Sequence, residues 1–179
     1  MLLRRMADYQ PERVDGAMAE LSAGPTEMRD ANRHWQALSR ARGAPTGLTR
    51  LRMALGEPID RRTRALGEVT VQLIHWRLPL WPDLWFQAVA TESGHVWEQL
   101  LVRPDPATAP ELASLADLVP WSCVIGDVDR AFPGGTHLEG DAASRWGLRL
   151  TAPGADGNPV VVTAQFVWGL LQRVVVADP

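Results

Sequence analysis

The segment Glu68–Leu73, EVTVQL, marks the change from a helical to a sheet pattern in this sequence. Its three apolar residues alternate with polar ones, which is the two-residue period of a strand with one buried face. Before this segment, apolar residues recur every three or four positions, as on one face of a helix. The change of period predicts an α+β fold, with N-terminal helices in residues 1–66 and a curved, mostly antiparallel sheet in residues 67–179.

Helical periodicity and helix-ending residues predict three helices in the N-terminal third of the chain. The first runs from Pro11 to Ser22, the second from Thr26 to Arg42, and a short third helix lies between Thr46 and Gly56. A further turn or two of helix is predicted between Pro58 and Leu66. The apolar face of the second helix carries Met28, Ala31, Trp35 and Leu38.

The remainder of the chain predicts about six strands with one inserted helix, at Glu111–Leu118. The residues between Phe132 and Ala143 are expected to form a Gly-rich loop. The last strand is long, and Gly169 is the position where we expect it to bend or bulge. The first predicted strand begins at Val69, and the others are Asp83–Thr91, His95–Arg103, Ser122–Asp129, Arg145–Thr151 and Val160–Val176.

Length and composition fit a single globular domain spanning residues 1–179. All 18 basic residues are Arg, which indicates the codon bias of a high-GC bacterium. The single Cys123 excludes an internal disulfide, and no apolar run reaches the length of a membrane span or of a signal peptide core. We therefore expect a cytoplasmic protein without a membrane partner. No residue pattern identifies a known family.

The charge is unevenly distributed along the chain. Residues 1–66 carry a net charge of +4 and residues 67–179 a net charge of −7. Either the two parts expose differently charged faces, or the helical part meets an acidic partner, nucleic acid or protein. The arginines that would contact such a partner are Arg29, Arg33, Arg40, Arg50 and Arg52.

A metal site is one hypothesis for the acidic region after residue 126. On a strand, Asp127 and Asp129 would share one face, and an extended segment would align His137, Glu139 and Asp141. Carboxylates and an imidazole in this arrangement could bind a divalent cation or supply an acid–base pair. The alternative is a solvated acidic loop, and no cofactor is predicted.

The eight Trp residues are unusual beside one Tyr and three Phe. Trp combines a large contact area with few rotatable bonds, so it is frequent at recognition surfaces. Trp81, Trp85 and Trp97 are the candidate interaction residues, and Trp81 is expected to be exposed on the loop Pro79–Pro82. The alternative is that most of these residues belong to the core.

Three histidines are candidates for general acid–base chemistry, namely His75, His95 and His137. The alternative is that each makes structural hydrogen bonds. Cys123 stands in an apolar segment without a nearby His in the sequence, so it is expected to be buried and unreactive.

Three functions stay open at this stage. The favoured one is a non-catalytic protein–protein interaction module, such as an accessory subunit of a bacterial assembly, that binds another protein or itself. The second is an enzyme or small-molecule binding protein with a pocket between the helices and the curved sheet. The third is a nucleic-acid-binding regulator, which the overall acidic charge disfavours.

Overall fold

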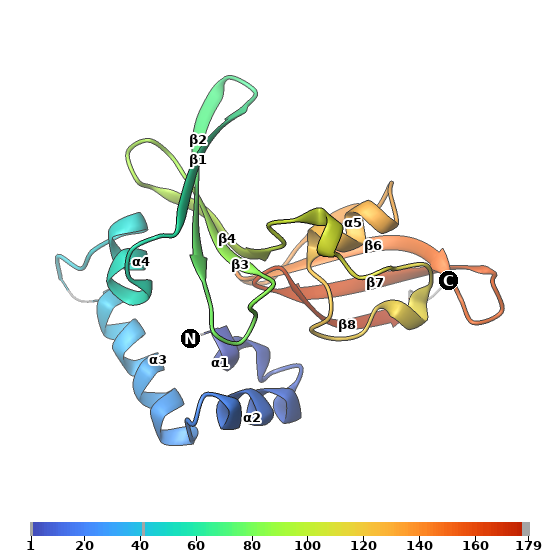
Figure 1. Ribbon diagram of the computed structural model, residues 1–179, viewed down its shortest axis with the longest axis horizontal. Coiled ribbons are helices and arrows are strands. Elements are labelled where there is room, and N and C mark those ends of the chain that lie inside the picture. Colours follow the sequence, from blue (N-terminus) through green and yellow to red (C-terminus); the bar gives the residue numbers. More distant parts are fainter. Residues whose placement is uncertain (1, 41, 177–179) are drawn as a thin grey trace. The chain divides into compact units, whose positions relative to one another are not determined.

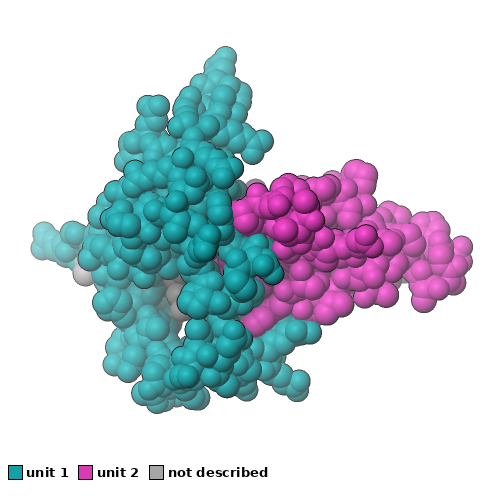
Figure 2. All heavy atoms as spheres, viewed as in Figure 1, with its two compact units in different colours: residues 1–99 teal, residues 100–179 magenta. Residues whose placement is uncertain are grey.

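The computed structural model describes residues 2–40 and 42–176 and confirms an α+β fold (Figure 1). The strands form two four-stranded antiparallel sheets, so there are eight strands where about six in one sheet were predicted. The chain divides into two compact units, unit 1 (Met1–Gln99) and unit 2 (Leu100–Pro179) (Figure 2). A single domain spanning both units stays a prediction. Among the described residues, no helix combines the length and the apolar character needed to cross a membrane.

The helices of unit 1 confirm the three that periodicity predicts. A further short helix precedes them, which the sequence did not predict because five residues are too few to establish a period. The four helices are α1 (Leu2–Met6), α2 (Pro11–Glu20), α3 (Pro25–Arg40) and α4 (Gly47–Leu55).

The sheet of unit 1 is a meander in the order β1-β2-β3-β4, and the division between the units falls within its last strand. Its strands are β1 (Asp60–Leu66), β2 (Val69–Arg77), β3 (Trp85–Ala90) and β4 (Val96–Val102). Figure 1 shows the β1–β2 hairpin projecting away from the helices of this unit. The face of β2 and β3 that contributes to the core carries Ile74, Trp76, Phe86 and Ala88, all buried.

The helical turn predicted at Pro58–Leu66 is wrong, because this segment contains strand β1. The register pairs Leu66 with Val69, so Gly67 and Glu68 form the turn between β1 and β2. The side chains of residues 61–66 are all exposed, and the strand therefore lacks the alternation of apolar residues that identifies strands in a sequence. Hydrogen bonding to β2, rather than burial, determines its conformation.

Unit 2 contains a second four-stranded meander in the order β5-β6-β7-β8. One face of this sheet is covered by buried residues of a helix and of the segment before it, which include Leu118, Val128 and Phe132. These residues pack with Leu148 and Phe166 of the sheet. The elements are α5 (Ile125–Ala131), β5 (Thr136–Glu139), β6 (Arg145–Pro153), β7 (Pro159–Val167) and β8 (Leu170–Val176), preceded by the 3-10 turns η1 (Pro106–Thr108) and η2 (Leu115–Asp117).

Three local predictions for unit 2 are wrong. The segment Ser122–Asp129 is not a strand, because α5 begins at Ile125 and only Val124 makes an isolated bridge to the sheet. The helix predicted at Glu111–Leu118 is reduced to the single turn η2, and the loop predicted at Phe132–Ala143 contains β5. Within Ser122–Asp129, the Asp127 carboxylate accepts a hydrogen bond from the Val124 N–H (3.1 Å). This bond favours the start of a helix over a continued strand.

The long last strand is a hairpin, with its turn at the position where a bend was expected. Val167 pairs with Leu170, so Trp168 and Gly169 are the two turn residues, with φ of 53° and 75°. Positive φ at both central residues is the requirement of the type I′ hairpin turn. The Leu101 N–H donates to the Trp168 carbonyl oxygen (2.7 Å), which anchors the turn within unit 2.

Gly169→Ala is predicted to destabilise the protein by about 2 kcal/mol. A Cβ at this position would lie 2.9 Å from the Leu101 carbonyl oxygen and would also face the unfavourable positive φ. Gly157→Ala is the matched control, because its φ is 78° but nothing lies within 4 Å of its added Cβ. Gly157→Ala should lower the free energy of unfolding by about 1 kcal/mol. Urea unfolding followed by Trp fluorescence measures both, and equal losses would contradict a role for the close approach.

Candidate functional site

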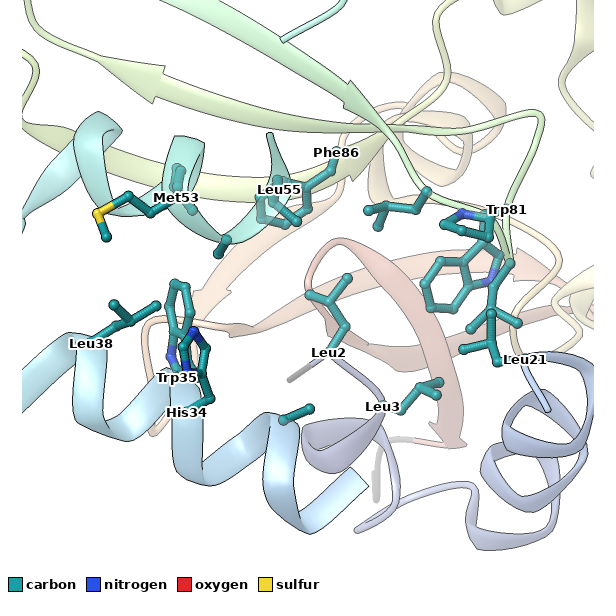
Figure 3. Close-up of a pocket in the computed structure, with 16 residues that line it drawn as sticks. Leu2, Leu3, Leu21, His34, Trp35, Leu38, Met53, Leu55, Trp81 and Phe86 are labelled. Atoms are coloured by element: carbon teal, nitrogen blue, oxygen red, sulfur yellow. The ribbon is translucent and has the colours of Figure 1, made fainter. Parts of the chain in front are cut away.

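An apolar groove lies within unit 1 and has a volume of about 390 Å³ (Figure 3). It is formed by α1, α3, α4, the segment of residues 78–81 and Phe86 of β3. We call it the unit 1 groove. Its lining residues are Leu2, Leu3, Leu21, Ala31, His34, Trp35, Leu38, Leu51, Met53, Ala54, Leu55, Leu78, Pro79, Leu80, Trp81 and Phe86.

Helix α3 supplies one wall of the groove. Its apolar face contributes Ala31, Trp35 and Leu38, and Figure 3 shows Trp35 and Leu38 pointing toward the side where α4 carries Met53. None of the described residues of α3 is fully buried. The apolar stripe that an amphipathic helix normally buries is therefore only half covered by unit 1 itself.

The groove has a buried floor and exposed rims. Leu51 and Phe86 are almost completely buried, whereas Met53 is 61% exposed and Leu21 is 42% exposed. Large apolar side chains at an open rim are typical of surfaces that another molecule covers. The groove is thus open to solvent rather than an enclosed cavity.

Arg50 of α4 contacts Trp35 of the groove without being one of the lining residues itself. Its Cζ is 5.2 Å from the centroid of the Trp35 ring, which is within the range of a cation–π interaction. The Nε atoms of Arg50 and Arg52 are buried, and neither has a hydrogen-bond partner among the described residues. These two Nε atoms are enclosed by the protein, and neither arginine is among the residues that line the groove.

The five candidate arginines do not form one surface. Arg29 and Arg33 line a separate hollow together with Arg4, on the side of α3 that faces away from the groove. Arg29 donates to the Thr26 hydroxyl (3.1 Å), and Arg33 pairs with Asp30 (2.9 Å). Arg40 is exposed at the end of α3, and only Arg50 contacts a residue of the groove in a described interaction.

The three candidate tryptophans occupy three different environments. Trp81 is only 9% exposed, so its predicted exposure on the loop is wrong; it forms part of the groove wall instead. A turn that includes the Leu84 N–H to Trp81 carbonyl hydrogen bond (3.0 Å) holds its backbone. Trp85 is half-buried, with its ring centroid 5.3 Å from that of His75. Trp97 is 51% exposed on β4.

The candidate metal ligands are dispersed among structural interactions. Asp127 is buried in α5 and pairs with Arg103, with 3.0 Å between its Oδ2 and the Arg103 Nε. On this helix Asp127 and Asp129 do not share a strand face as predicted. Asp129 pairs with His137 (2.8 Å), Asp141 pairs with Arg145 (2.8 Å), and Glu139 is exposed on β5. No group of three or more potential ligands occurs among the described residues.

The candidate catalytic histidines lie outside the groove. His75 is buried, with Nδ1 3.0 Å from Asp60 Oδ2 and Nε2 2.9 Å from Gln87 Oε1. His95 is exposed just before β4, and His137 is exposed beside Asp129. His34, which the sequence analysis did not select, does line the groove. Its signal was its place on the predicted apolar face of α3, four residues before Leu38.

Cys123 is fully buried, as predicted, and burial raises the pKa of its thiol to about 11. The folded state therefore binds the thiol proton more tightly than the unfolded state. Wild type should be more stable below pH 9 than above it, and should lose this stability relative to Cys123→Ala as the pH rises through about 11. Urea midpoints of both proteins across this range measure the difference, and parallel pH profiles would contradict the prediction.

Asp127→Ala is predicted to cost about 3–5 kcal/mol of stability. The change leaves the Arg103 guanidinium buried without its carboxylate and removes the acceptor for the Val124 N–H. Asp129→Ala is the control, because it removes a carboxylate from the same helix at a more exposed position and should cost less than about 1 kcal/mol. Equal urea midpoints for the two variants would show that the buried pair contributes no more than the exposed one.

Comparisons with known proteins do not assign this chain to a family. No protein-family model and no curated protein sequence matches it. A crystal structure from Streptococcus mutans described as a "putative beta-lactamase inhibitor protein" aligns over 74% of this chain and 83% of that chain. The sequence identity is 11% and the TM-score is 0.31, a similarity too low to support an argument about fold or function.

Proposed function

We propose that this protein is a non-catalytic interaction module that binds an apolar surface of a partner protein in the unit 1 groove. The single observation that supports this most is the combination of a buried apolar floor with exposed apolar rims. A partner that covers Met53 and Leu21 would remove apolar surface from water, which is the main driving force of association. Such a protein would act as an accessory subunit, in a bacterial assembly if the Arg-only composition reflects its source.

An enzyme or a small-molecule binding protein fits the groove less well. Such sites enclose most of the ligand surface and bring a few polar groups together around it. The groove is open, and His34 is the one titratable side chain among the described residues that line it. The candidate residues His75, His95 and His137 all lie elsewhere.

A nucleic-acid-binding function has less support, because it requires the candidate arginines to share one surface. Arg29 and Arg33 lie on the opposite side of α3 from the groove, whereas Arg50 contacts Trp35 on the groove side. The remaining basic footprint is small for a phosphate backbone.

Groove substitutions are predicted to abolish binding of the partner without unfolding the protein. Met53→Glu places a charge on an exposed rim residue, and Leu38→Asp places one on the apolar face of α3. Val175→Glu is the matched control, because Val175 is an exposed apolar residue of β8 in unit 2. Tagged proteins expressed in the native host and purified gently would be compared by light scattering and mass spectrometry.

Wild type and Val175→Glu should retain the same protein in a defined complex, and both groove variants should lose it, with at least a tenfold weaker affinity. Retention of the partner by both groove variants would contradict the proposal. So would a preparation in which wild type carries only a small molecule, detected by native mass spectrometry. Circular dichroism checks that each variant is folded.

A further inference from the structure

Strand β1 lies at an edge of the sheet of unit 1, in the hairpin that projects away from the helices (Figure 1). In the described part of the chain β2 is its one neighbour, and the side chains of residues 61–66 are all exposed. In an antiparallel pair, every second residue directs its N–H and C=O groups away from the neighbouring strand. The outer side of β1 therefore presents backbone donors and acceptors to which a further strand can bind.

The charge of β1 distinguishes it from the other edge strands of the two sheets. It carries Arg61, Arg62 and Arg64. The other three edge strands, β4, β5 and β8, together carry one arginine. Arg62 pairs with Asp60 (2.8 Å), whereas Arg61 and Arg64 have no ion-pair partner among the described residues. The edge thus offers two unpaired guanidinium groups beside its backbone groups.

The arginines of β1 lie on both faces of the sheet, because side chains alternate along a strand. Arg61 is on one face, and Arg62 and Arg64 are on the other. A strand added beside β1 also places its side chains on both faces, next to each of these arginines. Phosphate groups approach from one side and only accept hydrogen bonds, so they would leave the outward C=O groups without donors. The arrangement therefore favours an extended peptide over a nucleic acid.

The same arginines disfavour pairing of β1 with a second copy of itself. In an antiparallel register centred on residue 61, 62 or 64, an arginine lies opposite the same arginine of the other copy. The register centred on residue 63 brings Arg62 opposite Arg64. Like charges directly opposite each other destabilise a sheet, whereas carboxylates at these positions would form ion pairs across the strands. Charge complementarity thus selects an acidic segment.

We infer that β1 binds an extended, acidic segment of a partner protein as an added strand, with carboxylates of that segment beside Arg61 and Arg64. The backbone ladder supplies hydrogen bonds that any sequence can make, and the two arginines supply the preference for acidic residues. No residue of β1 lines the unit 1 groove, so the inference goes beyond the proposed function and does not rest on it.

The test uses three synthetic peptides of ten residues, built on the same scaffold of threonine and valine. Four positions, two on each face of the extended peptide, are Glu in the first peptide, Gln in the second and Lys in the third. Binding to the isotope-labelled full-length protein is measured by NMR at low and at physiological salt. We expect the Glu peptide to shift the amide signals of β1 and to bind at least tenfold more tightly than the Lys peptide, with a preference that decreases as salt increases.

Arg61→Gln combined with Arg64→Gln should remove most of the preference for the Glu peptide. Arg13→Gln combined with Arg40→Gln is the matched control, because it removes the same charge from exposed positions on α2 and α3. This control should retain the preference. Equal affinities of the three peptides for wild type would overturn the inference, and so would a preference that persists without Arg61 and Arg64.

The role of the backbone is tested with two N-methylated forms of the Glu peptide that carry equal numbers of methyl groups. In one form the methyl groups block the N–H groups of a single edge, and in the other they are divided between both edges. An added strand needs one free edge, so the first form should bind and the second should bind at least tenfold more weakly. Equal affinities of the two forms would show that β1 does not pair with the peptide backbone.

The same protein variants identify the alternative occupants. One alternative is nucleic acid, probed with an oligonucleotide of fifteen deoxythymidines. The other is a second copy of the chain, detected as a dimer by light scattering. If the oligonucleotide binds wild type more tightly than the Glu peptide does, or if wild type forms a dimer that the Arg61→Gln, Arg64→Gln variant does not, the inference is overturned.

Discussion

The hydrogen bond from the Trp76 indole N–H to the Gly56 carbonyl oxygen (2.9 Å) connects the end of α4 to the sheet of unit 1. Trp76 is almost fully buried and pairs in register with Phe86, which forms part of the groove floor. At the other end of α4, the Leu48 N–H donates to the Gly94 carbonyl oxygen (3.1 Å). The groove depends on these two attachments, because they fix the wall that carries Met53 and Arg50.

The opposite wall of the groove, α3, is attached less firmly than α4. None of the described residues of α3 is fully buried, and its apolar stripe lies partly in the groove. Elements with little buried apolar surface have the lowest local stability in a protein. The groove therefore combines a firmly attached wall, α4, with a wall, α3, that buries little apolar surface of its own.

The parts of the fold that the sequence predicts well are those in which local pattern and tertiary contacts agree. Helix α3 and strand β2 follow the periods of 3.6 and 2 residues, and both form where expected. Strand β1 and helix α5 could not be predicted in this way. The first consists of exposed residues that obtain their conformation from β2, and the second depends on Asp127, whose partner Arg103 is distant in the sequence.

In the candidate site, too, the sequence predicts local patterns better than tertiary contacts. The residues selected for chemistry are polar, and the structure places most of them in ion pairs or hydrogen bonds within their own unit, as for His75 with Asp60 and His137 with Asp129. Three of the groove residues, Ala31, Trp35 and Leu38, were visible on the apolar face of the second predicted helix. The sequence alone does not show how far later segments cover the apolar face of this helix, because burial depends on the whole of unit 1.

The two units differ in how completely they cover their apolar surface. In unit 2, one short helix and the preceding segment cover the sheet face with residues such as Val128 and Phe132. The described part of unit 1 has four helices, yet it leaves a groove bordered by Met53 and Leu21 exposed. Scattered apolar residues on a surface are ordinary, whereas an open apolar groove is a feature typical of interaction surfaces. This contrast between the two units is the reason for proposing that a partner covers the groove.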